Sequence, residues 1–294
     1  MRAVHQGVWL SGDAPLTDWQ RWKAATLTAD GTRLCDWSGA ALLGLRSKDR
    51  WPTTVKRPGE GGPKLYPAKE GRLGSLLVSF STIIDADTVT RDEIDVLHAG
   101  RIVLDLLDSV SGQTGRRMLR DALRLKLATP LELQLLIARH HGRRGIVDFR
   151  RYVHDYAGLG LDRTKSDAEA LALDLLRLAG GDPPAVNVVV AGGEGDLVYF
   201  ERGLIVELDG PQYHQFLLED AIKQARWEQA GWVVRRLPTD DVYDRPHRLL
   251  DEATRLVSDE ERQLARSTRS YEDVIVRLEA TRAARRSAVT RSGR

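Results

Sequence analysis

The spacing of hydrophobic and polar residues predicts strands and helices in both halves of the chain. In the N-terminal half, short β-like runs separated by glycines and prolines predict strands. Apolar residues three or four positions apart predict helices, which dominate from residue 101 onward. The expected strands are 2–10, 53–56 and 75–81, and the expected helices are 17–27, 38–45, 102–107, 115–127 and 129–140.

Capping residues place two of these helix starts. Thr17 stands where a hydroxyl can accept a hydrogen bond from the first turn of the helix. Thr129 is followed by Pro130 and by Glu132, which supplies the acid of a capping box. We therefore expect helices that begin at these two threonines.

The second half begins after an expected linker, residues 158–161. The predicted order beyond it is helix 166–178, strands 186–190, 196–200 and 204–208, helix 217–230, strand 232–237 and helix 248–257. A second capping box, residues 258–261, starts a charged terminal helix and a basic tail. We therefore expect an α/β fold in three parts. They are an α+β N-terminal region, residues 1–157, an α-β-β-β-α-β domain, residues 158–257, and a C-terminal helix with its tail, residues 258–294.

Composition limits the classes of protein only loosely. The 294 residues can build two cores, and 44 Lys+Arg against 42 Asp+Glu give no overall attraction for nucleic acid. One cysteine, Cys35, excludes an internal disulfide framework and a cysteine-based zinc site. The sequence shows neither an apolar run of membrane-spanning length nor a signal peptide, so we expect a cytoplasmic protein without a membrane partner.

Arginines are unevenly distributed along the chain. They cluster in the middle, at Arg139, Arg143, Arg144, Arg150 and Arg151, and in the tail, at Arg282, Arg285, Arg286, Arg291 and Arg294. The middle cluster predicts contacts with phosphates. The tail arginines are more typical of disordered charge.

Acidic residues mark the ends of two neighbouring predicted strands. Asp196 opens one strand, and Glu207 and Asp209 close the next. Unpaired carboxylates are costly near a sheet, so three of them at one end indicate a bound cation. A divalent metal that activates water at a phosphodiester is the natural candidate.

Residues 164–250 resemble the very-short-patch repair endonuclease-like family, within the PD-(D/E)XK nuclease superfamily. The matching residues are Ser166, Glu169, Asn187, Asp196, Glu207-Leu208-Asp209-Gly210, His214, Asp220, Lys223, Gly231-Trp232-Val233-Val234-Arg235-Arg236 and Asp241-Val242. The resemblance implies a restriction-endonuclease-like fold and an active site that comprises Glu169, Asp196, Glu207, Asp209, His214 and Lys223. It also implies Mg²⁺ or Mn²⁺ held by Asp196, Glu207 and the backbone carbonyl of Leu208.

The sequence departs from the superfamily pattern at one position. The lysine that gives the superfamily its name should lie two residues after Glu207, where this chain has Asp209. An acid at this position is usual in the subfamily. Either Lys223 or His214 could therefore take the role of this lysine.

The N-terminal half resembles the region that precedes this nuclease domain in actinobacterial proteins related to abortive-infection antitoxins. Residues 2–9 are similar to the end of a winged helix, and residues 38–41 and 101–106 match later positions. The helix-turn-helix that should precede Arg2 is missing. Either this form lost its DNA-reading helices, or the true start lies upstream. For the sequence as given, we expect no base-reading helix. DNA contacts should then be made to phosphates, through Arg143, Arg144, Lys223 and Arg226.

Simpler interpretations exist for most of these residues. Asp209 with Gly210 is ordinary turn chemistry, and an acid such as Glu169 stabilises the start of any helix. A lone loop histidine such as His214 usually has no catalytic role. Lys223 and Arg226 lie three positions apart, where they can simply solvate a helix face.

Two functions follow from these alternatives. The first is a metal-dependent endonuclease that hydrolyses DNA phosphodiester bonds in defence, in repair or in a toxin–antitoxin setting. The second is a non-catalytic nucleic-acid-binding or toxin–antitoxin regulatory protein on a nuclease-like scaffold. A protein partner and a homodimer are both compatible with either function.

Overall fold

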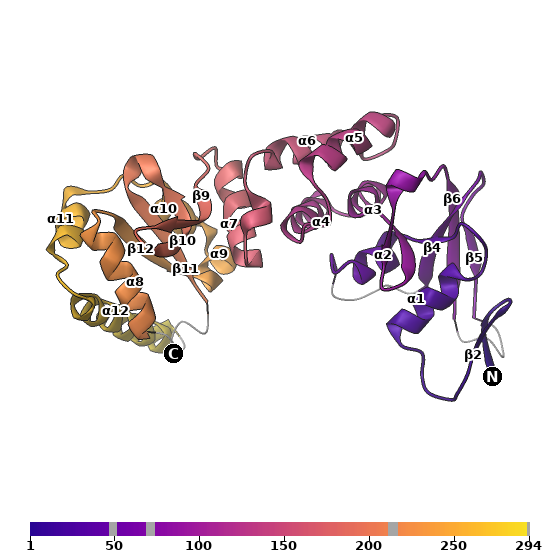
Figure 1. Ribbon diagram of the computed structural model, residues 1–294, viewed down its shortest axis with the longest axis horizontal. Coiled ribbons are helices and arrows are strands. Elements are labelled where there is room, and N and C mark those ends of the chain that lie inside the picture. Colours follow the sequence, from indigo (N-terminus) through magenta and orange to yellow (C-terminus); the bar gives the residue numbers. More distant parts are fainter. Residues whose placement is uncertain (47–51, 69–73, 211–216, 293–294) are drawn as a thin grey trace. The chain divides into compact units, whose positions relative to one another are not determined.

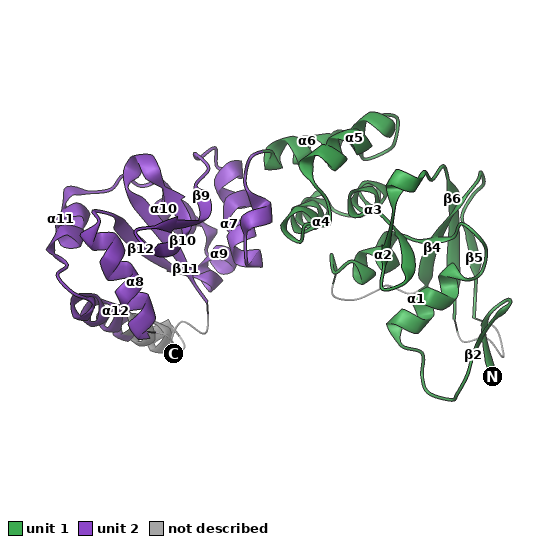
Figure 2. Cartoon of the chain, in the orientation of Figure 1, with its two compact units in different colours: residues 1–157 green, residues 158–294 purple. Residues whose placement is uncertain are grey.

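The protein has an α/β fold that divides into two compact units, residues 1–157 and 158–294 (Figure 2). None of the helices that could be assessed is both long and apolar enough for a membrane span. The computed structural model describes residues 1–46, 52–68, 74–210 and 217–292, with the backbone alone for residue 282 and residues 285–292.

Unit 1 is built on a mixed six-stranded sheet with the order β5-β6-β4-β3-β8-β7, and a separate hairpin, β1-β2 (Figure 1). Strand β4 is parallel to β6, β3 is parallel to β8, and the other neighbours are antiparallel. The strands are β1 (Arg2–His5), β2 (Val8–Leu10), β3 (Arg33–Leu34), β4 (Thr53–Pro58), β5 (Lys64–Tyr66), β6 (Leu76–Ser81), β7 (Thr88–Arg91) and β8 (Ile94–Leu97).

Six helices accompany this sheet. They are α1 (Asp18–Thr26), α2 (Asp36–Leu42), α3 (Ala99–Leu106), α4 (Gly112–Arg124), α5 (Pro130–Arg139) and α6 (Ile146–Tyr156). Capping boxes at Thr17 and Thr129 confirm the two predicted helix starts. The expected single strand over residues 2–10 is wrong, because Gly7 turns the chain with a φ of 78° and makes a hairpin.

A network of buried charges connects α3 to the sheet and to the end of α5. Arg101 is fully buried, and its guanidinium donates to Asp87 at 2.7 Å and to Asp105 at 3.1 Å. Asp105 also accepts a hydrogen bond from Arg143 at 2.6 Å and forms an ion pair with Lys56 of β4. Each buried charge in this network is therefore compensated by a neighbour of opposite sign.

Unit 2 contains the predicted α-β-β-β-α-β order. Helix α7 (Asp167–Leu178) precedes β9 (Ala185–Val190), β10 (Gly193–Tyr199) and β11 (Leu204–Asp209), and α8 (Leu217–Gln229) precedes β12 (Val233–Pro238). The sheet order is β12-β11-β10-β9, in which β12 is parallel to β11 and the other pairs are antiparallel. Helices α8 and α12 lie on one side of this sheet, and α7 and α9 lie on the other (Figure 1).

Four further helices complete unit 2. They are α9 (Thr239–Asp244), α10 (Pro246–Thr254), α11 (Asp259–Ser267) and α12 (Tyr271–Ser292). The capping box predicted at residues 258–261 starts α11. Helix α12 packs on α8 through Val274 and Leu278, and its Arg277 pairs with Glu228, a buried residue of α8. The C-terminal segment is thus part of the core of unit 2.

Candidate active site

The sheet of unit 2 opens around Asp196, in the middle of β10. Toward β9, the register pairs Gly195 with Val188 and then Leu197 with Val186, and it skips Asp196. Toward β11, pairing starts at Leu197 with Val206, one position beyond Asp196. A side chain can replace the missing backbone partners at such an opening.

Two carboxylates fill the opening between β10 and β11. Oε1 of Glu207 accepts the backbone N–H of Asp196 at 3.1 Å, and Oδ2 of Asp196 accepts the N–H of Leu208 at 2.8 Å. Glu207 is buried, with 3% of its surface exposed. Each strand therefore places one acid beside the acid of its neighbour.

This proximity changes the acidity of Asp196. Burial and, after it, the negative charge of Glu207 raise the pKa of Asp196 to about 7. Glu169 contributes in the same direction, and the Lys223 ammonium opposes it. A cation between these carboxylates would relieve the repulsion.

Unit 2 without metal should lose stability as the pH rises from about 4 to about 7. An unfolded aspartate releases its proton near the lower value, whereas folded Asp196 keeps its proton until about 7. In this window the folded state binds more protons, so a rising pH favours unfolding. Urea unfolding in EDTA at two pH values inside the window measures the loss. Asp196→Asn should remove most of it, and an equal loss in both proteins would contradict this assignment.

A lysine of helix α8 contacts Glu207, one of these two acids. Nζ of Lys223 lies 2.7 Å from Oε2 of Glu207 and 4.8 Å from the centre of the Trp227 ring. Gly193 allows this close approach, because a Cβ there would lie 2.7 Å from Cγ of Lys223. The site thus contains a lysine without having one two residues after Glu207.

Glu169 reaches the site from the first turn of α7. Its carboxylate accepts the amide of Asn187 at 2.7 Å and the N–H of Lys165 at 2.8 Å. The Ser166 hydroxyl, which caps α7, also donates to it at 2.8 Å. Glu169 therefore fixes the helix start, and its charge is still felt by Asp196.

Asp209 lies on β11 but has a different partner. Its Oδ1 lies 2.6 Å from Nη2 and 3.0 Å from Nε of Arg236, on the parallel strand β12. Both side chains are buried. The charge of Asp209 is therefore compensated by an arginine in place of the expected cation.

Of the other predicted residues, some lie outside the described residues and some belong to unit 1. His214 lies outside the described residues, as do the side chains of the tail arginines. Arg226 is exposed on α8. All members of the middle cluster belong to unit 1. Arg143 pairs there with buried Asp105, and Arg144 is exposed, 3.5 Å from Asp108.

Two polar residues near the site were not predicted as functional. Lys165 pairs with Glu194 at the mouth of the opening, and both side chains are partly exposed. Asn187, opposite Asp196, has a positive φ of 49° and turns its amide to Glu169. A signal existed for Asn187, because a polar asparagine interrupts the apolar pattern of β9. Lys165 lies outside the strands and gave no such signal.

The chemistry of the acids is compatible with a divalent cation. Mg²⁺ commonly uses one or two carboxylates and completes its coordination with water and substrate phosphates. Asp196 and Glu207 supply two neighbouring carboxylates. Within the part of the chain that the structure describes, no three His, Cys, Asp or Glu side chains are grouped to hold a metal ion without such help.

Comparison with known proteins adds no further information about the site. No family model, curated protein or solved structure matches the chain. The chemistry of the site is therefore inferred from its own geometry.

Proposed function

We propose that unit 2 is a metal-dependent endonuclease that hydrolyses DNA phosphodiester bonds. The adjacent pair of Asp196 and Glu207 in the opened sheet, with Lys223 on Glu207, is the observation that carries this proposal. The α-β-β-β-α-β order supports it. The resemblance to very-short-patch repair endonucleases supports it as well.

Each residue has a chemical role in this proposal. Asp196, Glu207 and the backbone carbonyl of Leu208 would hold Mg²⁺ or Mn²⁺. When bound, the cation would lower the pKa of a water molecule and neutralise charge on the phosphate. Lys223 would stabilise the oxyanion, and Glu169 would add negative charge beside the cation. His214 is an alternative proton donor.

One observation favours the alternative function, a nucleic-acid-binding or regulatory protein on a nuclease-like scaffold. Lys223 already compensates Glu207, and Arg236 compensates Asp209. Such pairs can stabilise an acidic cluster without any metal. Incubation with plasmid and with single-stranded DNA, in Mg²⁺, Mn²⁺ or EDTA, separates the two functions. Cleavage in the presence of metal supports the nuclease, and intact DNA in all samples supports the scaffold.

Metal should stabilise the nuclease but not the scaffold. At about 100 times its dissociation constant, a cation that binds only the folded state adds about 2.7 kcal/mol to the free energy of unfolding. This corresponds to a rise in Tm of roughly 5–10 °C for a unit of this size. Thermal melts with Mn²⁺ and with EDTA measure the rise. Identical melts, together with no calorimetric binding signal, would favour the scaffold.

DNA binding should depend steeply on salt and weakly on sequence. Lys223, Arg226 and Arg144 offer point charges for phosphates, and phosphate contacts contain little sequence information. Each neutralised phosphate releases counterions, so affinity should fall several-fold or more between about 50 and 200 mM salt. Fluorescence anisotropy with competing unrelated duplexes tests this. A salt-tolerant preference for one duplex would contradict it.

A further inference from the structure

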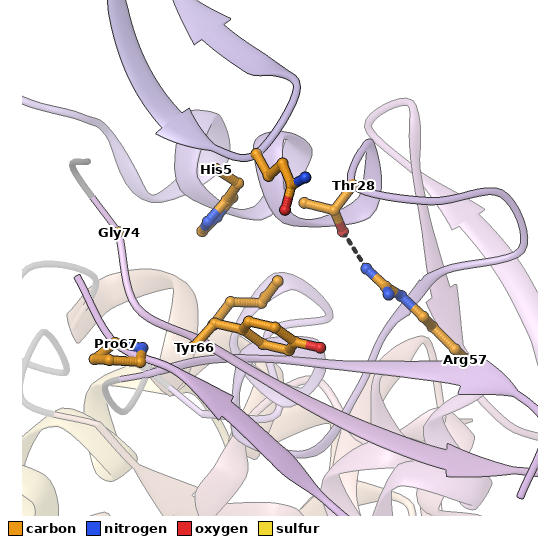
Figure 3. Close-up of a pocket in the computed structure, with 8 residues that line it drawn as sticks. His5, Thr28, Arg57, Tyr66, Pro67 and Gly74 are labelled. Atoms are coloured by element: carbon orange, nitrogen blue, oxygen red, sulfur yellow. Dashed lines mark hydrogen bonds between the residues drawn. The ribbon is translucent and has the colours of Figure 1, made fainter. Parts of the chain in front are cut away.

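Unit 1 contains a cavity of about 260 Å³ between the hairpin β1-β2, the end of α1 and the sheet strands β4–β6. Figure 3 shows Tyr66 on one side of this cavity, with His5 and Thr28 on the other and Arg57 at one end. The residues of its lining that have polar side chains are His5, Gln6, Thr28, Arg57 and Tyr66. None of the described lining residues is acidic.

Arg57 is fixed in place without a carboxylate. Its Nε donates to the Thr32 hydroxyl at 3.1 Å, and its Nη2 donates to the Thr28 hydroxyl at 2.8 Å. These hydroxyls in turn donate to the carbonyls of Ala29 and Ala25, so their orientation is set. Among the described residues, Arg57 forms no ion pair. Its positive charge is therefore oriented, and no described acid compensates it.

The free donors of Arg57 suit a phosphate group. A guanidinium has five N–H donors, and two of them are used by the threonines. The others include the Nη1 group, which with Nη2 forms the end of the fork that binds phosphate oxygens in pairs. Because Arg57 is half-buried, an anion there would be partly shielded from water.

The opposite part of the cavity suits a flat ring. Tyr66 is 45% exposed, although it is a large aromatic residue at the end of β5, and its ring borders the cavity (Figure 3). An exposed aromatic face is the surface on which a nucleobase stacks. Gln6, which also lines the cavity, offers an amide donor and acceptor for the edge of a base.

We propose that this cavity binds a nucleoside monophosphate, with its phosphate on Arg57 and its base against Tyr66. The site lies within unit 1 and does not depend on the nuclease function proposed for unit 2. The volume is near the lower end for small-molecule sites, which suits a single nucleotide.

Calorimetric titration of the full chain tests the two halves of the site separately. The probes are the four common ribonucleoside monophosphates, ribose 5-phosphate, inorganic phosphate and adenosine, all in EDTA. We expect at least one monophosphate to bind about fivefold or more tightly than ribose 5-phosphate, because stacking adds to the phosphate contact. Equal affinity for ribose 5-phosphate and the best monophosphate would overturn the proposal, as would the absence of any binding.

Variants connect the binding to the named residues. Arg57→Gln should weaken the best monophosphate about tenfold or more, because hydrogen bonds to a charged group are lost. Tyr66→Leu should remove the preference over ribose 5-phosphate, and exposed Tyr66 can be replaced without threatening the fold. Arg91→Gln, an exposed arginine in the same sheet, is the control and should bind like the wild type.

Arg57→Lys covers the case in which Arg57→Gln does not fold. It keeps the charge but removes the fork, and it should still weaken the monophosphate several-fold. Unchanged binding in Arg57→Lys and in Tyr66→Leu would overturn the proposal.

Discussion

Asp196→Asn and Glu207→Gln are each expected to abolish metal-dependent DNA cleavage while unit 2 stays folded. Each replacement keeps the shape of the side chain and removes one of two adjacent negative charges. The cleavage rate should fall more than about 100-fold. Replacing a residue that only supports a metal ligand costs up to about 100-fold, and replacing a ligand itself should cost more. In EDTA both variants should be as stable as the wild type or more stable, because the repulsion that raises the pKa of Asp196 is gone.

Plasmid cleavage and thermal melts of the same samples measure both effects. Glu201→Gln is the matched control, since Glu201 is an exposed acid in the turn between β10 and β11. It should cleave like the wild type. Cleavage that survives in Asp196→Asn would assign the activity to another site or to a contaminant. If the variants that lose cleavage are also unfolded, the result no longer supports a catalytic pair.

Arg101→Met is expected to be the most destabilising single change in unit 1. Arg101 is fully buried, and its removal leaves Asp87 without its 2.7 Å partner and Asp105 without one of its cations. Breaking a buried pair costs about 3–5 kcal/mol, and we expect the lower end here, because Arg139 and His140 each remain 3.2 Å from Asp87. The Tm of unit 1 should fall by roughly 10 °C.

Scanning calorimetry of the full chain measures this fall. Arg91→Met is the control, because Arg91 and Asp92 are both exposed and contact each other only at 3.9 Å. It should change Tm by no more than about 1 °C. The transition that Arg101→Met shifts should be unaffected by Asp196→Asn, because the two residues belong to different units. A shift below about 2 °C in Arg101→Met would show that the network contributes little to stability.

The sequence predicted most elements of unit 2, because each is marked by a local signal. Short runs rich in Val, Leu and Ile mark the strands, and Ser166 and Ser258 cap helices. Unit 1 was harder to predict. The hairpin of β7 and β8 and the helix α6 were missed, since Thr90, Arg91 and Asp95 are too polar for an apparent strand pattern.

The partners of charged residues were not predictable from local patterns. Arg236 lies in the predicted strand 232–237, and only the parallel register of β11 and β12 brings it to Asp209. Arg143 seemed available for phosphates, but the fold places Asp105 beside it. For Lys223 the expectation from the sequence agrees with the structure, since this residue of α8 pairs with Glu207. Pairing over long sequence separation depends on topology, which propensity does not encode.

Helix α8 contacts both the candidate site and helix α12. One face presents Lys223 to Glu207, and another presents Ala221, Ala225 and Glu228 to α12. Helix α12 therefore supports, through its packing on α8, the helix that holds Lys223 beside Glu207.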